Sequence, residues 1–278
     1  MPLKLTEKHA EETAEIRETQ ERGGMKLRPL AFPAALANLQ PSTPRSLMLK
    51  VCLDTSAFTV NAALYRDGHL LGQEQADAST SVSLAVPRVL EALLAPQKIA
   101  VRDIGQWDLG IGPGSFTGTR VGIAFAKGVA LISGARLRGV NSGFAFLPAA
   151  LRRNPGLKRL SVLHDGRRDE LILNPLEKSG ETWQVAAPAE VIKTLDLAKF
   201  LPPGEDFLFA TCLTPAAFAA LPPELVARIL FVTGPEAAGL ELDPQEALAA
   251  DDLGLEKALE PIYVRPAVFV APILSRQI

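Results

Sequence analysis

The sequence has 278 residues, of which 47% are hydrophobic and 22% are charged, fractions that are typical of globular proteins and exclude a chain disordered throughout. The length corresponds to one or two domains, and the formal net charge of −2 excludes a general binder of polyanions. Both cysteines, Cys52 and Cys212, lie in apolar runs, so we expect reduced core residues and no disulfide framework.

The sequence carries no signal of a membrane or secreted protein. Its most apolar stretch, 121–135, is interrupted by Lys127 and is shorter than the roughly 18 residues of a membrane helix. The N-terminus has no apolar core behind its basic residues, and its six glutamates argue against a transit peptide. We therefore expect a cytoplasmic protein that does not bind membranes.

Residues 1–47 differ in composition from the rest of the chain. Residues 6–21 are almost wholly polar, and two glycines and four prolines follow them. Because this stretch offers no apolar face for packing, we expect a poorly ordered extension and linker. Its function would be to recruit a partner. The alternatives are that it is a loose tail, or that translation of the natural protein starts at Met48.

From Met48 onwards, short apolar and β-rich runs predict a first lobe over residues 48–152. Its expected elements are strands at 49–54, 59–65, 69–75, 107–111 and 137–140, and helices at 83–95 and 118–133. Asp67-Gly68, between the second and third strands, is typical of a hairpin turn. Three antiparallel strands followed by alternating helices and strands predict a mixed sheet covered by helices, as in ribonuclease H-like folds.

A second, smaller lobe is expected over residues 153–234. Its expected elements are strands at 160–163, 170–173, 183–186, 207–210 and 229–232, and a helix at 189–199. Residues 235–278 would form a C-terminal segment that packs back on the lobes. The predicted fold class is therefore α/β, with two ribonuclease H-like lobes whose mixed sheets are covered by helices.

A glycine-rich loop at 112–118 precedes the longest predicted helix. It is not a P-loop, because Thr119-Arg120 follows its last glycine, and Thr117 stands where a dinucleotide fingerprint or a nucleophile elbow requires glycine. The loop could bind an anion through free N–H groups at the start of the helix. It could equally be a tight connection that requires small residues, and the loop alone does not decide.

Small residues recur at every fourth position of the following helix, at Gly118, Gly122, Ala126 and Ala130. Since an interior glycine costs about 1 kcal/mol relative to alanine, we expect another backbone to pack closely against this stripe. The helix is apolar nearly all round, so it is either fully buried or partly buried at a subunit interface.

Four motifs resemble those of the TsaB family, within the glycoprotease-like (Gcp-like) group. They are Asp-Thr-Ser at 54–56, the loop and helix at 112–131, His-Asp-Gly-Arg-Arg-Asp-Glu at 164–170, and Pro-Ile-Tyr-Val-Arg-Pro at 261–266. The resemblance covers residues 48–266. It implies an actin/Hsp70-type fold and a role in making threonylcarbamoyladenosine next to the anticodon of tRNAs that read A-starting codons.

The resemblance also implies a non-catalytic subunit that pairs with a related catalytic subunit, TsaD, and with the ATPase TsaE. ATP or ADP and a divalent metal would then be held by these partners, and free chains would be monomers or homodimers. Catalytic relatives carry a His-x-x-x-His metal site, whereas His9, His69 and His164 have no such spacing. We therefore expect no catalytic residue and no metal ligand in this chain.

The resemblance places the subunit interface on the two helices of the first lobe. The interface residues that we expect are Val86, Leu90, Leu93 and Leu94 on the first helix, and Gly118, Gly122, Phe125, Ala126 and Ala130 on the second. The alternative is that the small-residue stripe packs on the chain's own sheet. Ser81-Val82-Ser83 stands where many relatives carry His-Ser-Glu, so the resemblance gives weaker support for interface contacts at that end of the first helix.

An ATP-binding phosphotransferase or ATPase of the same fold superfamily is the alternative function. Its nucleotide or anion site would be formed by Asp54, Thr55, Ser56, Gly112, Gly114, Ser115 and Arg120. The turn after Asp54, however, lacks the glycines that let a backbone approach a phosphate. A peptidase is less well supported, because three scattered histidines provide no Ser–His–acid set.

Ten basic residues and only one acidic residue lie between positions 120 and 168. Six of the basic residues could contact tRNA in the assembled complex if their two clusters meet in space. These are Arg152, Arg153, Lys158 and Arg159 in one cluster, and Arg167 and Arg168 in the other. Otherwise they are scattered, solvated surface charge.

Overall fold

The computed structural model of the chain describes residues 48–78, 81–249 and 251–264. The predicted N-terminal extension, the last two residues of the motif at 261–266 and the end of the C-terminal segment lie outside these residues. In the described part of the chain, no helix combines the length and apolar character that a membrane span requires.

The first lobe contains a five-stranded mixed sheet in the order β3-β2-β1-β4-β5. The strands are β1 (Leu49–Asp54), β2 (Thr59–Arg66), β3 (His69–Asp77), β4 (Gln106–Gly110) and β5 (Arg136–Val140). β2 runs antiparallel to β1 and β3, whereas β4 runs parallel to β1 and β5. Asp67 and Gly68 both have positive φ, +49° and +80°, as a type I′ hairpin turn requires. The five predicted strands and the hairpin are confirmed.

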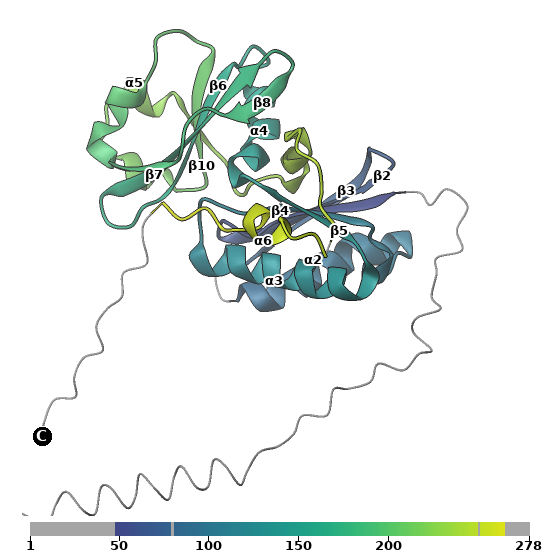
Figure 1. Cartoon of the computed structure of the whole chain (residues 1–278). Coiled ribbons are helices and arrows are strands. Elements are labelled where there is room, and N and C mark those ends of the chain that lie inside the picture. Colours follow the sequence, from purple (N-terminus) through teal and green to yellow (C-terminus); the bar gives the residue numbers. More distant parts are fainter. Residues whose placement is uncertain (1–47, 79–80, 250, 265–278) are drawn as a thin grey trace, which may run out of the picture. The chain divides into compact units, whose positions relative to one another are not determined.

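Two helices, α2 (Val82–Leu94) and α3 (Phe116–Ser133), lie side by side on one face of this sheet (Figure 1). Val51 and Leu53 on β1 belong to the core beneath these helices, whereas Cys52 belongs to the core on the opposite face, following the two-residue period of a strand. α3 begins where the Ser115 hydroxyl accepts a hydrogen bond from the Gly118 N–H at 3.1 Å. It ends at Gly134, whose φ of +73° is typical of a helix C-cap.

The second lobe contains a six-stranded sheet in which β11-β10-β6-β7-β8 form the main path and β9 pairs with β7. Its strands are β6 (Arg159–Asp165), β7 (Glu170–Ser179), β8 (Thr182–Val185), β9 (Glu190–Lys193), β10 (Phe207–Thr211) and β11 (Ile229–Phe231). The predicted helix at 189–199 is wrong. Residues 190–193 pair with β7, burying Ile192, and only the 3₁₀-helix η5 (Thr194–Phe200) follows. The β-branched pair Val191-Ile192 fits a half-buried strand better than a helix.

Short helices cover both faces of the second sheet. On one face are η5, η6 (Pro215–Phe218) and α5 (Pro223–Val226). On the other, η4 (Ser142–Phe146), α4 (Leu147–Arg153) and η7 (Ala237–Leu242) contribute to a core that also contains Cys52 and Tyr65 of the first sheet. The chain therefore has the predicted fold class, two mixed sheets covered by helices.

The segment after η7 returns to the first lobe. Leu248 forms a β-bridge with Leu137 of β5, α6 (Leu255–Ala258) contacts the same strand, and the Ile262 N–H donates to the Ile111 carbonyl at 2.8 Å. This route brings Tyr263 next to the start of α3, where its ring centroid lies 5.1 Å from that of Phe116.

Candidate functional site

The turn after β1 and the glycine loop, which the sequence joined in one candidate anion site, do lie together. The Ser115 N–H donates to the Ser56 carbonyl at 2.6 Å, and the Thr55 hydroxyl donates to the Gly118 carbonyl at 2.8 Å. The loop backbone is anchored at Gly112, whose N–H donates to the Ser142 hydroxyl at 3.0 Å. These polar groups therefore hydrogen-bond to one another, and the bonds hold the β1 turn against the glycine loop and the start of α3.

Asp54, the acidic residue of the predicted nucleotide site, is completely buried. Its Oδ1 accepts hydrogen bonds from the Ser56 N–H at 3.0 Å and the Ser56 hydroxyl at 2.8 Å. Its Oδ2 lies against Gly110, where an added Cβ would come within 1.9 Å of it. Burial raises the pKa of this carboxyl because desolvation disfavours the charged form. Mg²⁺ that carries a phosphate is usually held by an ionised carboxylate, and a buried carboxyl of this kind does not provide one.

The two remaining members of the predicted anion site are also engaged. A Cβ at Gly114 would lie 2.3 Å from the Ser56 carbonyl oxygen, so the loop packs directly on the β1 turn. The Arg120 guanidinium lies 3.7 Å from the centroid of the Phe116 ring, and its Nε donates to the Tyr263 hydroxyl at 2.6 Å. The residues present thus do not form the cradle for ATP and magnesium that the alternative function needs.

The small-residue stripe of α3 faces the chain's own sheet. A Cβ at Gly122 would lie 2.5 Å from the Thr55 hydroxyl oxygen, and one at Gly118 would lie 2.1 Å from the Thr55 carbonyl oxygen. Ala126 and Ala130 are buried. Of the two interpretations of the stripe, the structure selects packing on the chain's own sheet.

The apolar residues predicted for the interface also belong to the first-lobe core. Val86, Leu90, Leu93 and Leu94 are at most 5% exposed, and the half-buried Phe125 packs edge-on against Trp107 with ring centroids 6.2 Å apart. The nine residues expected at the interface are therefore corrected to internal packing residues, because the helices need this face to cover the sheet.

The opposite faces of the same helices are exposed and carry large apolar side chains, one on α2 and two near the end of α3. Leu84 of α2 is 61% exposed, and Leu131 and Ile132 of α3 are 78% and 88% exposed. Gly128 lies on this outer face as well, since a Cβ there would meet no atom within 4 Å. The sequence does indicate an apolar outer face, because α3 is apolar nearly all round. The interface was instead predicted on the small-residue stripe, whose regular spacing is the more conspicuous pattern.

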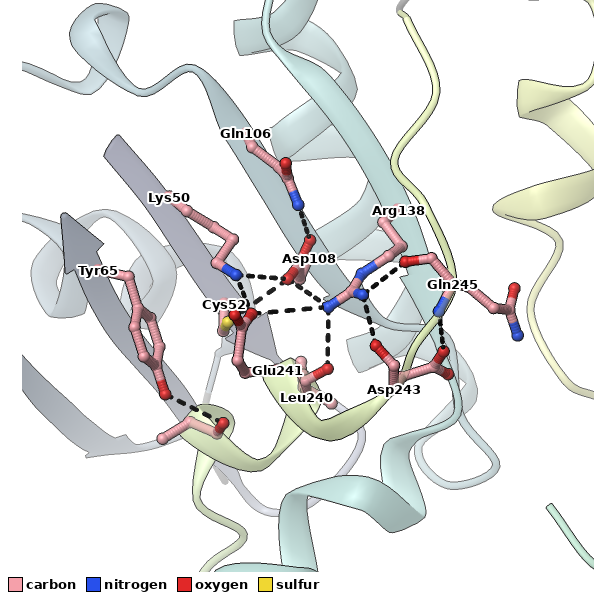
Figure 2. Close-up of polar contacts among 11 residues, drawn as sticks. Lys50, Cys52, Tyr65, Gln106, Asp108, Arg138, Leu240, Glu241, Asp243 and Gln245 are labelled. Atoms are coloured by element: carbon pink, nitrogen blue, oxygen red, sulfur yellow. Dashed lines mark hydrogen bonds and ion pairs between the residues drawn. The ribbon is translucent and has the colours of Figure 1, made fainter. Parts of the chain in front are cut away.

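A second polar cluster, which the sequence analysis did not identify, lies on the other face of the first sheet (Figure 2). Arg138 of β5 donates to the Asp108 carboxylate at 2.5 Å and to the carbonyls of Leu240, Asp243 and Gln245 at 2.7 to 3.0 Å. Four acceptors on one buried guanidinium fasten η7 and the segment after it to the sheet.

The same cluster contains three groups with the chemistry of metal ligands. Atoms of Cys52, Asp108 and Glu241 lie within 4.8 Å of one another. The Lys50 ammonium, however, contacts the carboxylates of both Asp108 and Glu241, and burial raises the pKa of the Cys52 thiol, which favours the thiol over the thiolate that binds metals. The internal cations thus already balance the carboxylates, and we interpret the cluster as structural.

The two basic clusters predicted to contact tRNA do not meet. Arg159 stands at the start of β6, and Arg167 and Arg168 follow its end, about 20 Å away for a seven-residue strand. Arg152 forms an ion pair with Glu236, and Arg159 donates to Asp206 at 2.6 Å; Arg153 and Lys158 are exposed. The single patch required by the tRNA hypothesis is therefore absent among the described residues.

Two solved structures from Pseudomonas aeruginosa share this arrangement of two mixed sheets. One is an uncharacterized protein with similarity to peptidase YeaZ, with a TM-score of 0.62, 21% identity, and coverage of 79% of this chain and all of the other. The second is YeaZ, with a TM-score of 0.60, 19% identity, and coverage of 78% of this chain and all of the other. The class of protein is thus the two-lobed α/β fold of the YeaZ structures.

The family model described as TsaD, tRNA N6-adenosine threonylcarbamoyltransferase, matches residues 76–232. The chain belongs to this family and is a TsaB-like member of it. It is 30% identical over 121 residues to the TsaB protein of Escherichia coli, covering 44% of this chain and 52% of that one. With the Bacillus subtilis TsaB protein it shares 25% identity over 154 residues, covering 55% and 66%.

A third curated relative is the tRNA N6-adenosine threonylcarbamoyltransferase of Maridesulfovibrio salexigens. It is 30% identical over 167 residues, which cover 53% of this chain and 47% of the relative. The chain thus spans about half the length of the Escherichia coli and Maridesulfovibrio relatives that it matches.

Proposed function

We propose that this chain is a non-catalytic subunit of tRNA threonylcarbamoyladenosine biosynthesis, which pairs with a TsaD-like catalytic subunit and works with a TsaE-like ATPase. Membership of the family and the curated names of two TsaB relatives support the process. The observation that carries the pairing is the exposed apolar outer face of α2 and α3.

This outer face has the properties of a helix-packing surface. Leu84, Leu131 and Ile132 provide exposed apolar area, and Gly128 leaves open space above the α3 backbone. Small residues let a second helix approach closely, and large apolar neighbours fill the grooves on either side. Large apolar side chains that stay exposed, such as Leu131 and Ile132 near the end of α3, are also typical of a protein interaction site. We propose that a helix of the catalytic partner packs on this surface.

The chemistry of the remaining residues favours a supporting role for the chain. His69 is exposed on β3, whereas His164 is buried on β6, so the described histidines lie in different lobes and do not form a pair of metal ligands. The buried, hydrogen-bonded Asp54 disfavours nucleotide hydrolysis by the chain itself. We therefore propose that ATP or ADP, the divalent metal and the tRNA are bound mainly by the partner subunits and the assembled complex.

The test is a double substitution on the outer face, Leu131→Lys with Ile132→Lys. Lysine keeps good helix propensity and interacts favourably with a helix C-terminus, so the chain should stay folded. We expect at least a tenfold loss of affinity for the TsaD-like subunit, because two charges would be buried on association. The measurement is co-purification together with calorimetric titration.

Leu195→Lys is the matched control, because Leu195 is 69% exposed in the second lobe and its replacement should leave pairing unchanged. Sedimentation of each free chain will show whether the same face supports a homodimer. Undiminished pairing of the double variant with a normal melting temperature would contradict the proposal.

A further inference from the structure

Two asparagine side chains meet at the junction between the lobes. Asn141 directly follows β5 of the first sheet, and Asn174 lies within β7 of the second sheet. The Asn174 Nδ2 donates to the Asn141 Oδ1 at 2.7 Å, and the Asn141 Nδ2 donates to the Asn174 Oδ1 at 3.1 Å. Asn174 is completely buried and Asn141 is 8% exposed. The two amides thus form a reciprocal pair that is shielded from water.

This reciprocal pairing tolerates little movement of one lobe relative to the other. Each amide has a carbonyl acceptor and an NH₂ donor, and both bonds form only while the heavy atoms stay close to 3 Å apart. A shift of roughly 1 Å at the junction would break both bonds. It would leave buried polar atoms without partners, which is costly. The pair therefore favours one orientation of the lobes.

The side chain of Asn141 is held in place by its own turn. Its Oδ1 also accepts a hydrogen bond from the Gly143 N–H at 2.8 Å and so caps the start of η4. A Cβ at Gly143 would lie 2.5 Å from the Asn174 Nδ2, so the close approach of the two lobes requires glycine at this position. Asn141 is therefore oriented for pairing by contacts within the first lobe.

The same turn is tied to the glycine loop that precedes α3. The Ser142 N–H donates to the Gly112 carbonyl at 2.8 Å, and the Gly112 N–H donates to the Ser142 hydroxyl at 3.0 Å. Two adjacent residues thus bind different parts of the molecule, Asn141 the second sheet and Ser142 the loop. The position of the second lobe is thereby linked to the loop from which α3 begins.

Apolar side chains from both sheets surround the junction. Val140, immediately before Asn141, and Leu176, two residues after Asn174, belong to one core that also contains Cys52 of the first sheet. In such surroundings a satisfied hydrogen-bond pair is stronger, and an unpaired polar group more costly, than at the surface. The shared core resists separation of the lobes but is non-directional. The amide pair supplies the direction.

We propose that the Asn141–Asn174 pair is a clasp that locks the two lobes in one orientation, so that the chain does not open and close between them. Two-lobed proteins commonly move by hinge closure around a ligand, and a buried reciprocal pair at the junction opposes such a motion. A chain with fixed lobes presents its surfaces to a partner without an ordering cost on association. The inference does not depend on the proposed subunit pairing, because the clasp lies within the chain.

Distances between spin labels in the two lobes of the full chain test the clasp. The labels are attached through Glu91→Cys on α2 and Leu195→Cys on η5, since both positions are exposed. Cys212→Ser removes the native thiol that is only partly buried. Asn141→Ser is the test variant, because a serine hydroxyl still caps a helix but is too short to pair with Asn174. We expect one narrow distance distribution in the unmodified background and at least a twofold broader one in the variant.

Asn154→Ser is the matched control. Asn154 also accepts a glycine N–H two residues later, from Gly156 at 3.1 Å, and its Nδ2 donates to the Glu205 carbonyl at 2.8 Å. Both of these partners lie in the second lobe, so the distribution should stay narrow.

Asn174→Ala removes the clasp from the other side and should broaden the distribution as much as Asn141→Ser does. Because the two variants break the pair from opposite lobes, either one suffices if the other fails to fold. A broad distribution in the unmodified background would overturn the inference. A narrow distribution in a folded clasp variant would also overturn it, because other contacts would then hold the lobes.

Discussion

The inner and outer faces of α3 carry the same residue type for opposite structural reasons. Gly122 on the inner face faces Thr55, whose hydroxyl oxygen would lie 2.5 Å from an added Cβ, whereas Gly128 on the outer face meets nothing within 4 Å. The inner glycine is required by the chain's own packing, and the outer one is not required by any contact within the described residues. A glycine in a helix therefore does not by itself show that another segment packs closely against the helix. The atoms that its face meets must also be known.

The largest expected effect comes from adding a Cβ on the inner face. Gly122→Ala places a methyl group against Thr55, and the helix and the β1 turn must separate to accommodate it. We expect a loss of about 2 kcal/mol in the free energy of unfolding, within the usual cost of overpacking a core, measured by urea denaturation. The larger Gly122→Leu change should prevent stable folding, so it cannot serve as a selective test of subunit pairing. An unchanged urea midpoint for Gly122→Ala would show that the contact is loose.

An intermediate effect is expected at Asp54, which anchors the turn that α3 packs against. Burial raises the pKa of its carboxyl in the folded state, so as the pH rises above 3.8 the unfolded chain ionises first and stability falls until the folded-state pKa is reached. Asp54→Asn keeps an acceptor for the Ser56 N–H and removes the ionisation. We expect this variant to be more stable than the unmodified chain at pH 7, with the advantage shrinking towards pH 4.

Thermal unfolding of both chains across this pH range provides the measurement. Asp165→Asn is the matched control, because it makes the same substitution at an exposed carboxyl. If Asp54→Asn were instead less stable at pH 7, the ionised carboxylate would be stabilising the turn, and the site would be better suited to hold a cation than we infer.

The sequence predicted the elements whose signals are local. The short apolar, β-rich runs of β1 and β2 and Asp67-Gly68 at the hairpin each act within a few residues, and the structure has them where expected. The helix predicted at 189–199 failed because pairing with β7, a tertiary contact, determines the conformation of residues 190–193. Local propensity is only a weak guide where such pairing is available.

The candidate sites were harder to predict because the role of each residue depends on which part of the chain, ligand or partner its side chain faces. The loop and the β1 turn were correctly joined, but whether Thr55 and Ser56 face a ligand or the loop itself cannot be read from their identity. Lys50, Asp108 and Arg138 form one cluster, yet they are up to 88 positions apart in the chain and match no spacing pattern. Helical periodicity defines a face of α3 but does not say whether the chain itself or a partner covers it.

The smallest expected effect has the opposite sign and lies on the outer face. Gly128→Ala adds a methyl group where the structure leaves open space, so helix propensity alone should determine the result, and we expect a gain of about 1 kcal/mol in the free energy of unfolding. Gly134→Ala is the control. A Cβ at Gly134 would also meet open space, but its φ of +73° disfavours alanine, so this change should destabilise the chain. A loss of stability in Gly128→Ala would mean that something in the free chain already covers the outer face, and this face would then be unavailable to the catalytic partner.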